Sequence, residues 1–262
     1  MSTVTSADGT TIDYDRDGQG PAVVFVGGAT QYRALDEDTS KAAHQLAAEG
    51  FTTVVYDRRG RGRSDDTAPW SLEREVDDLA ALIKAVGGAA TLYSSSSGAA
   101  IALAAATAGI GVTGLALYEP PFFAGADHTE HLAALRSLLA RGQHDEAMRY
   151  NLTTVIGIPR EAVEGMAQSP VWPAMVAVAP TLVYDLAAVH EINVDPDWRA
   201  RWAAVTVPAV VCSGDQSFPG MAEAADAVAA ALPTARRQTL AGQGHGPTPE
   251  VMVSVLREFL RP

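Results

Sequence analysis

The feature that most limits the fold of this 262-residue chain is a long stretch, Ala85–Tyr118, without a single charged side chain. A transmembrane helix is one interpretation, because roughly 20 apolar residues span a bilayer. However, the pair Gly87-Gly88, the serine run Ser94–Ser97 and Gly109 divide the stretch into shorter pieces. Parallel sheets that are covered on both faces contain buried, uncharged strands of this kind. The stretch therefore predicts a strand, a helix and a second strand in a protein core.

Composition and charge exclude several classes of protein. Hydrophobic residues make up 47% of the chain, which is too high for a disordered protein. The formal net charge of −12 argues against binding to nucleic acid or to an anionic membrane. Cys212 is the single cysteine, so an intramolecular disulfide is impossible, as suits a reducing compartment. Residues 1–8 lack the basic and apolar segments of a secretory signal, and we expect a cytoplasmic globular protein.

Strand and helix patterns alternate on both sides of the neutral stretch. After an N-terminal hairpin, we expect strands at 22–26, 51–56, 89–93 and 112–118 and helices at 41–49, 72–86 and 99–108. This alternation predicts an α/β fold with a mostly parallel sheet and helices on both faces. Between Pro120-Pro121 and a strand at 207–212 we expect only helices, at 131–141, 145–154, 160–167 and 181–190. A helix at 221–232, a strand at 235–240 and a helix at 249–260 complete the chain. We therefore expect a core of residues 1–121 and 203–262, interrupted by a helical insertion at 122–202.

Three motifs each suggest a ligand, but the local pattern favours a structural role for each of them. Gly109–Gly114 matches G-x-G-x-x-G, but it leads from a helix to a strand, the reverse of a dinucleotide-binding turn. Arg58–Arg63 alternates arginine and glycine without interleaved aromatics, which favours a structured loop over RNA binding. His128 and His131 could share a helical face, but no further metal ligand follows at a recognised spacing. We expect neither a cofactor nor a metal.

The serine run predicts a sharp turn from strand to helix. A linker is not expected between an apolar strand and an alanine-rich helix, whereas a tight turn needs small residues two positions before and after its apex. Ser94 and Gly98 meet that need and place Ser96 at the apex with its hydroxyl exposed. The turn also directs the backbone amide of Ser97 toward a site where an oxyanion would form. Ser96 is therefore the candidate nucleophile.

Two further segments complete a candidate catalytic site. The pair Gly27-Gly28 ends the first buried strand and allows close backbone approach, so the amide of Gly28 or Ala29 could be the second oxyanion donor. His245 lies between glycines after the last strand, where a loop could present its imidazole to Ser96. A serine hydroxyl needs such a base, because it is a poor nucleophile until its proton is removed.

Together these motifs resemble the α/β-hydrolase superfamily over nearly the whole chain. Tyr56–Ser64 is similar to the D-x-R-G-x-G-x-S loop of that family, and Gly242–Gly246 is similar to its G-x-G-H turn. Val207–Gly214 resembles the strand that leads to the loop of the triad acid. The resemblance implies that residues 122–202 form a cap over the active site.

The triad acid departs from the family pattern. The position three residues after Gly214, where the family commonly has aspartate, holds Ser217, which cannot stabilise an imidazolium as a carboxylate does. Asp215 lies in the same loop, shifted by two residues. Glu119 ends the preceding sheet strand, and some superfamily members, including certain haloalkane dehalogenases, resemble this arrangement. Glu119 is the favoured acid, Asp215 is the alternative, and a site without an acid remains a third possibility.

The favoured function is hydrolysis of a carboxylic ester or lactone of a small, apolar molecule through an acyl-enzyme. The aromatic and methionine residues of the insertion could line an apolar pocket, although such residues more often pack helices together: Phe122, Phe123, Met166, Trp172 and Met175. Without a working acid, the same scaffold could only bind a small ligand. Ser96 and His245 could also serve C–C bond hydrolysis or cofactor-free perhydrolysis, which the fold alone does not distinguish.

Overall fold

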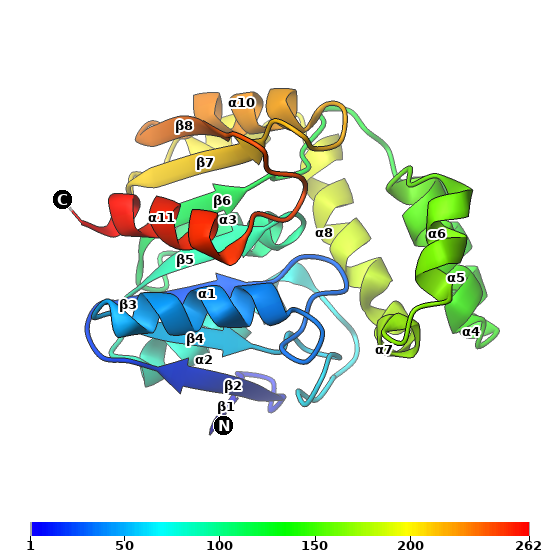
Figure 1. The fold of residues 1–262 in the computed structure, drawn as a ribbon, viewed down its shortest axis with the longest axis horizontal. Helices are drawn as coiled ribbons and strands as arrows, with labels where there is room; N and C mark the ends of the chain where they lie inside the picture. The colour runs from blue at the N-terminus through cyan, green and yellow to red at the C-terminus, as the bar shows by residue number, and fades with distance from the viewer. Residues whose placement is uncertain (1, 262) are drawn as a thin grey trace.

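The protein is built around one eight-stranded sheet (Figure 1). The computed structural model describes residues 2–261. The strands lie in the order β1-β2-β4-β3-β5-β6-β7-β8. The pairs β1–β2 and β2–β4 are antiparallel, and every later pair in this order is parallel. Their bounds are β1 Ser2–Thr5, β2 Thr11–Asp17, β3 Ala22–Val26, β4 Thr52–Tyr56, β5 Ala90–Ser95, β6 Val112–Tyr118, β7 Ala209–Gly214 and β8 Ala235–Leu240. The mostly parallel sheet confirms the predicted fold class.

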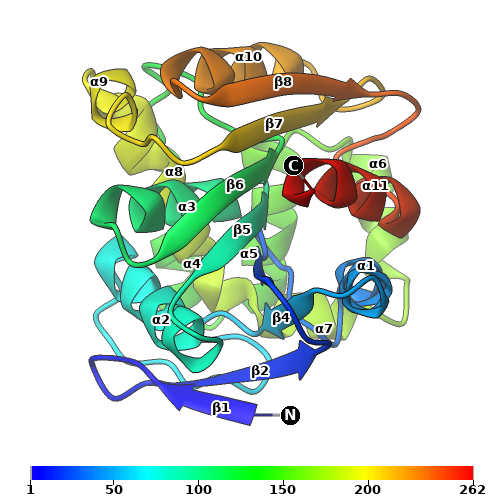
Figure 2. The same ribbon diagram turned by 90° about the vertical axis from the view of Figure 1, so that its left-hand side faces the viewer.

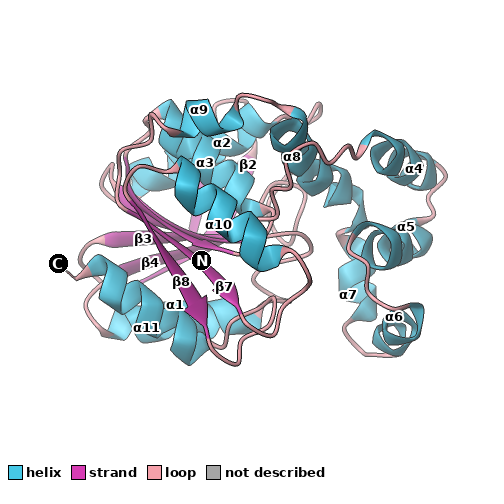
Figure 3. Ribbon diagram, turned by 90° about the horizontal axis from the view of Figure 1, so that it is seen from above, coloured by secondary structure: helices cyan, strands magenta, loops and turns pink. Residues whose placement is uncertain are grey.

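Helices cover both faces of the sheet (Figure 3). Helices α1 (Glu37–Ala48) and α11 (Pro249–Leu260) pack on one face, where Leu46 and Leu256 join the apolar side chains of the strands. Helices α2 (Leu72–Ala85), α3 (Gly98–Ala108) and α10 (Met221–Ala231) pack on the other face. Figure 2 shows the twist of the strands from β1 to β8 between these two layers. Burial on both faces explains why the strands are continuous apolar runs.

The neutral stretch forms β5, α3 and β6 in the centre of this arrangement. All six residues of β5 are buried, and α3 is apolar around most of its circumference because it packs between the sheet and other helices. Within residues 2–261 no helix is long and apolar enough to cross a membrane. The transmembrane interpretation of this stretch is therefore wrong, and its division into strand, helix and strand is confirmed.

Residues between β6 and β7 form only helices. They are α4 (Thr129–Ala140), α5 (His144–Tyr150), a π-helical segment Asn151–Val155, α6 (Arg160–Ala167), α7 (Trp172–Ala177), a 3-10 turn Ala179–Thr181, α8 (Leu182–Val194) and α9 (Trp198–Trp202). Helices α4–α7 lie at the side of the molecule toward which the parallel strands point, and α8 lies between them and the sheet (Figure 1). The short helices α7 and α9 were not predicted, because neither contains enough turns to show a clear periodicity.

Helix beginnings follow local capping. Ser71 directly precedes α2, and its side chain accepts a hydrogen bond from the backbone amide of Arg74. Helix α1 begins at Glu37, four residues before the expected start at 41, because Asp36 caps it by accepting from the amide of Thr39.

The contact between α3 and β3 leaves no space for a side chain at Gly98. A Cβ there would lie 2.6 Å from the carbonyl oxygen of Val26. We predict that Gly98→Ala lowers the free energy of unfolding by about 1–3 kcal/mol, measured by urea denaturation.

The matched control is Gly165→Ala in α6, where a Cβ would meet no atom within 4 Å. That change should raise the free energy of unfolding by about 0.5–1 kcal/mol, because alanine favours helix over glycine. Equal effects of the two substitutions would contradict the close approach of α3 to β3.

Candidate active site

Ser96 occupies a strained turn between β5 and α3. Its φ of 51° lies in the left-handed region, which is unusual for a residue other than glycine. Its backbone amide donates to the carbonyl oxygen of Tyr118 at 2.9 Å, which holds the turn against the end of β6. Ser94 and Gly98 lie on either side, both buried, as the crowded backbone requires. The turn presents the hydroxyl of Ser96 to a cavity at the carboxyl edge of the sheet.

His245 connects Ser96 to a carboxylate. Its Nε2 lies 3.1 Å from Oγ of Ser96, and its Nδ1 lies 2.5 Å from Oε2 of Glu119. The three residues come from three separate loops, after β5, β6 and β8. If Nδ1 carries the proton that it donates to Glu119, Nε2 is free to accept the proton of Ser96.

Glu119 is fully buried and surrounded by hydrogen-bond donors. Oε1 accepts from the backbone amide of Gly214 at 2.9 Å, and Oε2 accepts from the hydroxyl of Ser217 at 2.6 Å as well as from His245. A buried carboxylate is tolerated when its oxygens are satisfied in this way. Ser217 occupies the position where the family commonly has the acid. It donates instead to Glu119, the acid at the end of β6.

Asp215 lies outside this group. Its side chain is exposed, and Oδ1 accepts from the backbone amide of Gly242 at 2.7 Å. This contact joins the loop after β7 to the loop that carries His245. The structure thus gives Asp215 a place in loop packing and brings Glu119, not Asp215, to the imidazole.

The expected oxyanion donors divide into two groups. Ala29 and Ser97 both line the cavity beside Ser96, and within residues 2–261 no acceptor takes up either backbone amide. The amide of Gly28 instead donates to Oε1 of Gln31 at 2.5 Å. The expectation that Gly28 is an oxyanion donor is therefore wrong. Glycine is needed at this position for space, because a Cβ there would lie 2.7 Å from the carbonyl oxygen of Ser95.

The cavity has a volume of about 260 Å³ and is mainly apolar. Its walls are Ala29, Ser96, Ser97, Pro121, Phe123, His128, Asn151, Val155, Ile156, Leu182, Asp185, Leu186, Val189, Phe218, Pro219, Met221 and His245. Of the aromatic and methionine residues considered from the sequence, Phe123 lines it. Phe122, Met166, Trp172 and Met175 do not, because they pack within the core or among the inserted helices.

The motifs that suggested other ligands have structural roles. Gly109 ends α3 in the left-handed conformation, so the G-x-G-x-x-G match is a helix end. Arg58, Arg59 and Arg61 are buried and paired with carboxylates, not displayed to solvent. The ring of His131 contacts the hydroxyl of Tyr150. Within the described part of the chain, no group of histidine, cysteine and acidic side chains could hold a metal.

Comparison with known proteins identifies the family of this chain. Residues 23–255 match the model of the alpha/beta hydrolase family, and the chain belongs to that family. It is 42% identical to an alpha/beta hydrolase from Sphaerobacter thermophilus, over 99% of this chain and 100% of that one, with a TM-score of 0.89. A thermophilic esterase from Thermogutta terrifontis is 24% identical over 99% and 97% of the two chains (TM-score 0.73). An esterase from Rhodococcus is 20% identical over 99% and 98% (TM-score 0.66).

Three groups at the site have roles that were not predicted from the sequence. Gln31 accepts from the amide of Gly28, three residues before it, and Ser217 donates to the distant Glu119. Asp185 of α8 also lines the cavity. Its signal was present in the sequence, because it is a carboxylate within the otherwise apolar run Leu182–Val189.

Burial of Cys212 in β7 makes this thiol an unsuitable nucleophile. Desolvation raises the pKa of Cys212 to about 12, so the reactive thiolate is scarce near neutral pH. We predict that Ellman's reagent at pH 8 does not modify the folded protein and modifies one thiol per chain after unfolding in guanidinium. Rapid modification of the folded protein would contradict the burial of β7.

Proposed function

We propose that this protein is a serine hydrolase that cleaves carboxylic esters or lactones of small, apolar molecules. The observation that supports this proposal most strongly is the continuous contact from Ser96 through His245 to Glu119. A nucleophile, a base and a carboxylate in this order form a catalytic triad whatever fold carries them. The family and the relatives named as esterases favour the same class.

In this proposal the reaction proceeds through an acyl-enzyme on Ser96. Oγ of Ser96 attacks the ester carbonyl while Nε2 of His245 takes its proton, and Glu119 stabilises the imidazolium. The carbonyl oxygen becomes an oxyanion, which accepts hydrogen bonds from the amides of Ala29 and Ser97. The tetrahedral intermediate then expels the alcohol, which receives the proton from His245. Water attacks the acyl-enzyme by the same route, releases the acid and restores Ser96.

The cavity favours a small and apolar substrate. Besides the catalytic groups, much of its wall is aliphatic or aromatic, with Leu182, Leu186 and Val189 from α8 and Phe218 beside His245. Its volume of about 260 Å³ lies just below the usual range for drug-sized ligands, about 300–1,000 Å³. An ester with short acyl and alcohol groups, or a small lactone, suits this space.

The helical insertion acts as the cap in this proposal. Residues 122–202 supply cavity walls opposite the sheet edge, while residues 1–121 and 203–262 carry Ser96, Glu119 and His245. The ligand-binding alternative needs a site without an acid, and the contact of Glu119 with His245 favours hydrolysis over it. Hydrolysis of a C–C bond or perhydrolysis would use the same residues, and no contact among residues 2–261 favours either.

Substitution of the carboxylates tests the choice of acid. We predict that Glu119→Gln lowers kcat on p-nitrophenyl acetate by about 10²–10⁴-fold, because an amide cannot stabilise the imidazolium. Asp215→Asn should stay within about threefold of wild type, since asparagine retains the acceptor for Gly242. Ser96→Ala supplies the blank rate. The reverse ranking of the two carboxylate variants would refute Glu119 as the acid.

An ester series tests the substrate class. We predict that kcat/KM for p-nitrophenyl esters is highest for acyl groups of two to four carbons and falls beyond them, since the cavity is small. Ser96→Ala should abolish turnover at every length. A maximum at long acyl chains, or binding without turnover across the series, would contradict the proposed substrate.

A further inference from the structure

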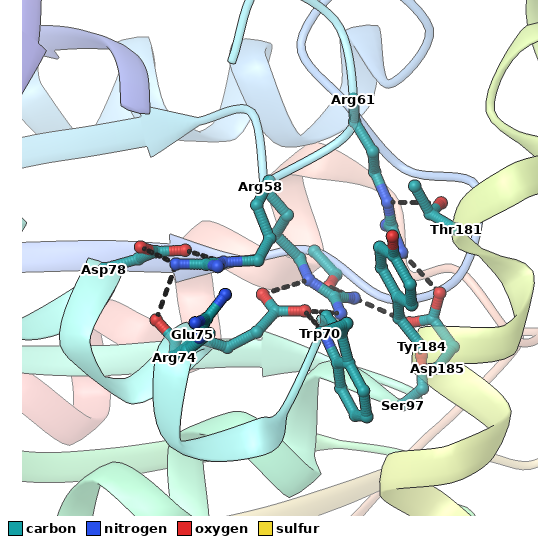
Figure 4. Close-up of polar contacts among 12 residues, drawn as sticks. Arg58, Arg61, Trp70, Arg74, Glu75, Asp78, Ser97, Thr181, Tyr184 and Asp185 are labelled. Atoms are coloured by element: carbon teal, nitrogen blue, oxygen red, sulfur yellow. Dashed lines mark hydrogen bonds and ion pairs between the residues drawn. The ribbon is translucent and has the colours of Figure 1, made fainter. Parts of the chain in front are cut away.

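A group of buried charged residues includes Asp185, which also lines the cavity (Figure 4). Arg58 and Arg61 come from the loop after β4, and Asp185 comes from α8. Oδ1 of Asp185 accepts from Nη1 of Arg58 at 2.6 Å, and Oδ2 accepts from Nη2 of Arg61. Arg58 is also bound by Glu75 of α2 through both carboxylate oxygens. The two arginines and two carboxylates balance in charge, which permits their burial.

The same carboxylate holds one of the two oxyanion donors. The hydroxyl of Ser97 donates to Oδ1 of Asp185 at 2.8 Å, and both side chains are buried. Ser97 directly follows Ser96, and its backbone amide faces the cavity in the proposed mechanism. This hydrogen bond restrains the orientation of Ser97, so the direction of its backbone amide depends on Asp185.

The second oxyanion donor depends on Arg61. Nη1 of Arg61 donates to the carbonyl oxygen of Gly28 at 2.6 Å, and Arg58 donates to the carbonyl of Gly27 at 3.2 Å. The carbonyl of Gly28 and the amide of Ala29 belong to one planar peptide group, in which they point in opposite directions. A guanidinium on the carbonyl therefore fixes the amide toward the cavity and also polarises it, which strengthens the amide as a donor.

We propose that Asp185, through Ser97 and Arg61, is a positioning residue for the oxyanion hole. This inference rests on the proposed function and extends it, because it makes the inserted helix α8 part of the catalytic apparatus as well as a wall of the cavity. Burial disfavours the charged form of Asp185, but Arg58 and Arg61 outweigh it and lower the pKa of this carboxyl. Asp185 therefore stays ionised and keeps both arginines in place.

The arrangement predicts a specific kinetic defect. Donors that are misdirected by a small angle still admit the substrate but stabilise the oxyanion less, so kcat should fall while KM changes little. Removing one donor outright costs about 10²–10³-fold in kcat in a well-studied serine protease, which sets the upper range for loss of positioning. A residue that only attached α8 to the core would instead affect stability or KM.

The test compares Asp185→Asn with a matched control, Asp78→Asn. Asp78 pairs with Arg59 from the same loop at 2.7 and 2.8 Å and is as deeply buried, but neither residue contacts Gly28 or Ser97. With p-nitrophenyl acetate, Asp185→Asn should lower kcat about 10–100-fold with KM within about threefold. Affinity for trifluoroacetone, which forms an oxyanion adduct with serine, should fall in parallel. Asp78→Asn should change both quantities by less than about threefold.

A milder variant keeps the test informative if Asp185→Asn does not fold. Ser97→Ala removes one hydroxyl and leaves every charge in place, and it should lower kcat and trifluoroacetone affinity about 3–10-fold. The inference is overturned, while the proposed function stands, if kcat and trifluoroacetone affinity fall no further in Asp185→Asn and Ser97→Ala than in Asp78→Asn. Wild-type protein without ester turnover would instead contradict the proposed function itself.

Discussion

The hydrogen bond between His245 and the buried carboxylate of Glu119 is the interaction on which the site depends. It joins the loop after β8 to the end of β6, and the amide of Gly214 and the hydroxyl of Ser217 bind the same carboxylate from the end of β7. Three neighbouring strands thus meet at one side chain. Because a carboxylate without donors is costly to bury, these loops must take this arrangement together. The position of the imidazole beside Ser96 follows from it.

The inserted helices are joined to this site by charge as well as by apolar packing. Apolar side chains of α8 form one wall of the cavity, and Asp185 on the same helix binds the arginines behind Gly28 and the hydroxyl of Ser97. A hydrophobic contact alone would leave α8 free to slide, whereas paired and hydrogen-bonded charges fix its position. In our proposal the insertion therefore sets the size of the substrate and the geometry of the oxyanion donors.

Much of the fold could be predicted from the sequence, because periodicity and turn residues are local signals. The strands, the helices on the sheet and the strained turn at Ser96 all follow from them. Long-range side-chain contacts could not be predicted in this way. Nothing near Ser217 indicates that it donates to Glu119, which lies 98 positions earlier in the chain. Asp185 was visible as a charge in an apolar helix, but its partners lie more than 80 residues away in the chain.

The proposed activity requires that Ser96 is a nucleophile activated by His245 and Glu119. Labelling with diisopropyl fluorophosphate, followed by peptide mass spectrometry, tests this requirement, because the reagent bonds covalently to an activated serine. We expect one adduct per chain, located on Ser96, and much slower formation of this adduct in Glu119→Gln. Absence of labelling in the folded protein, or an adduct on Ser94, Ser95 or Ser97 instead, would contradict it.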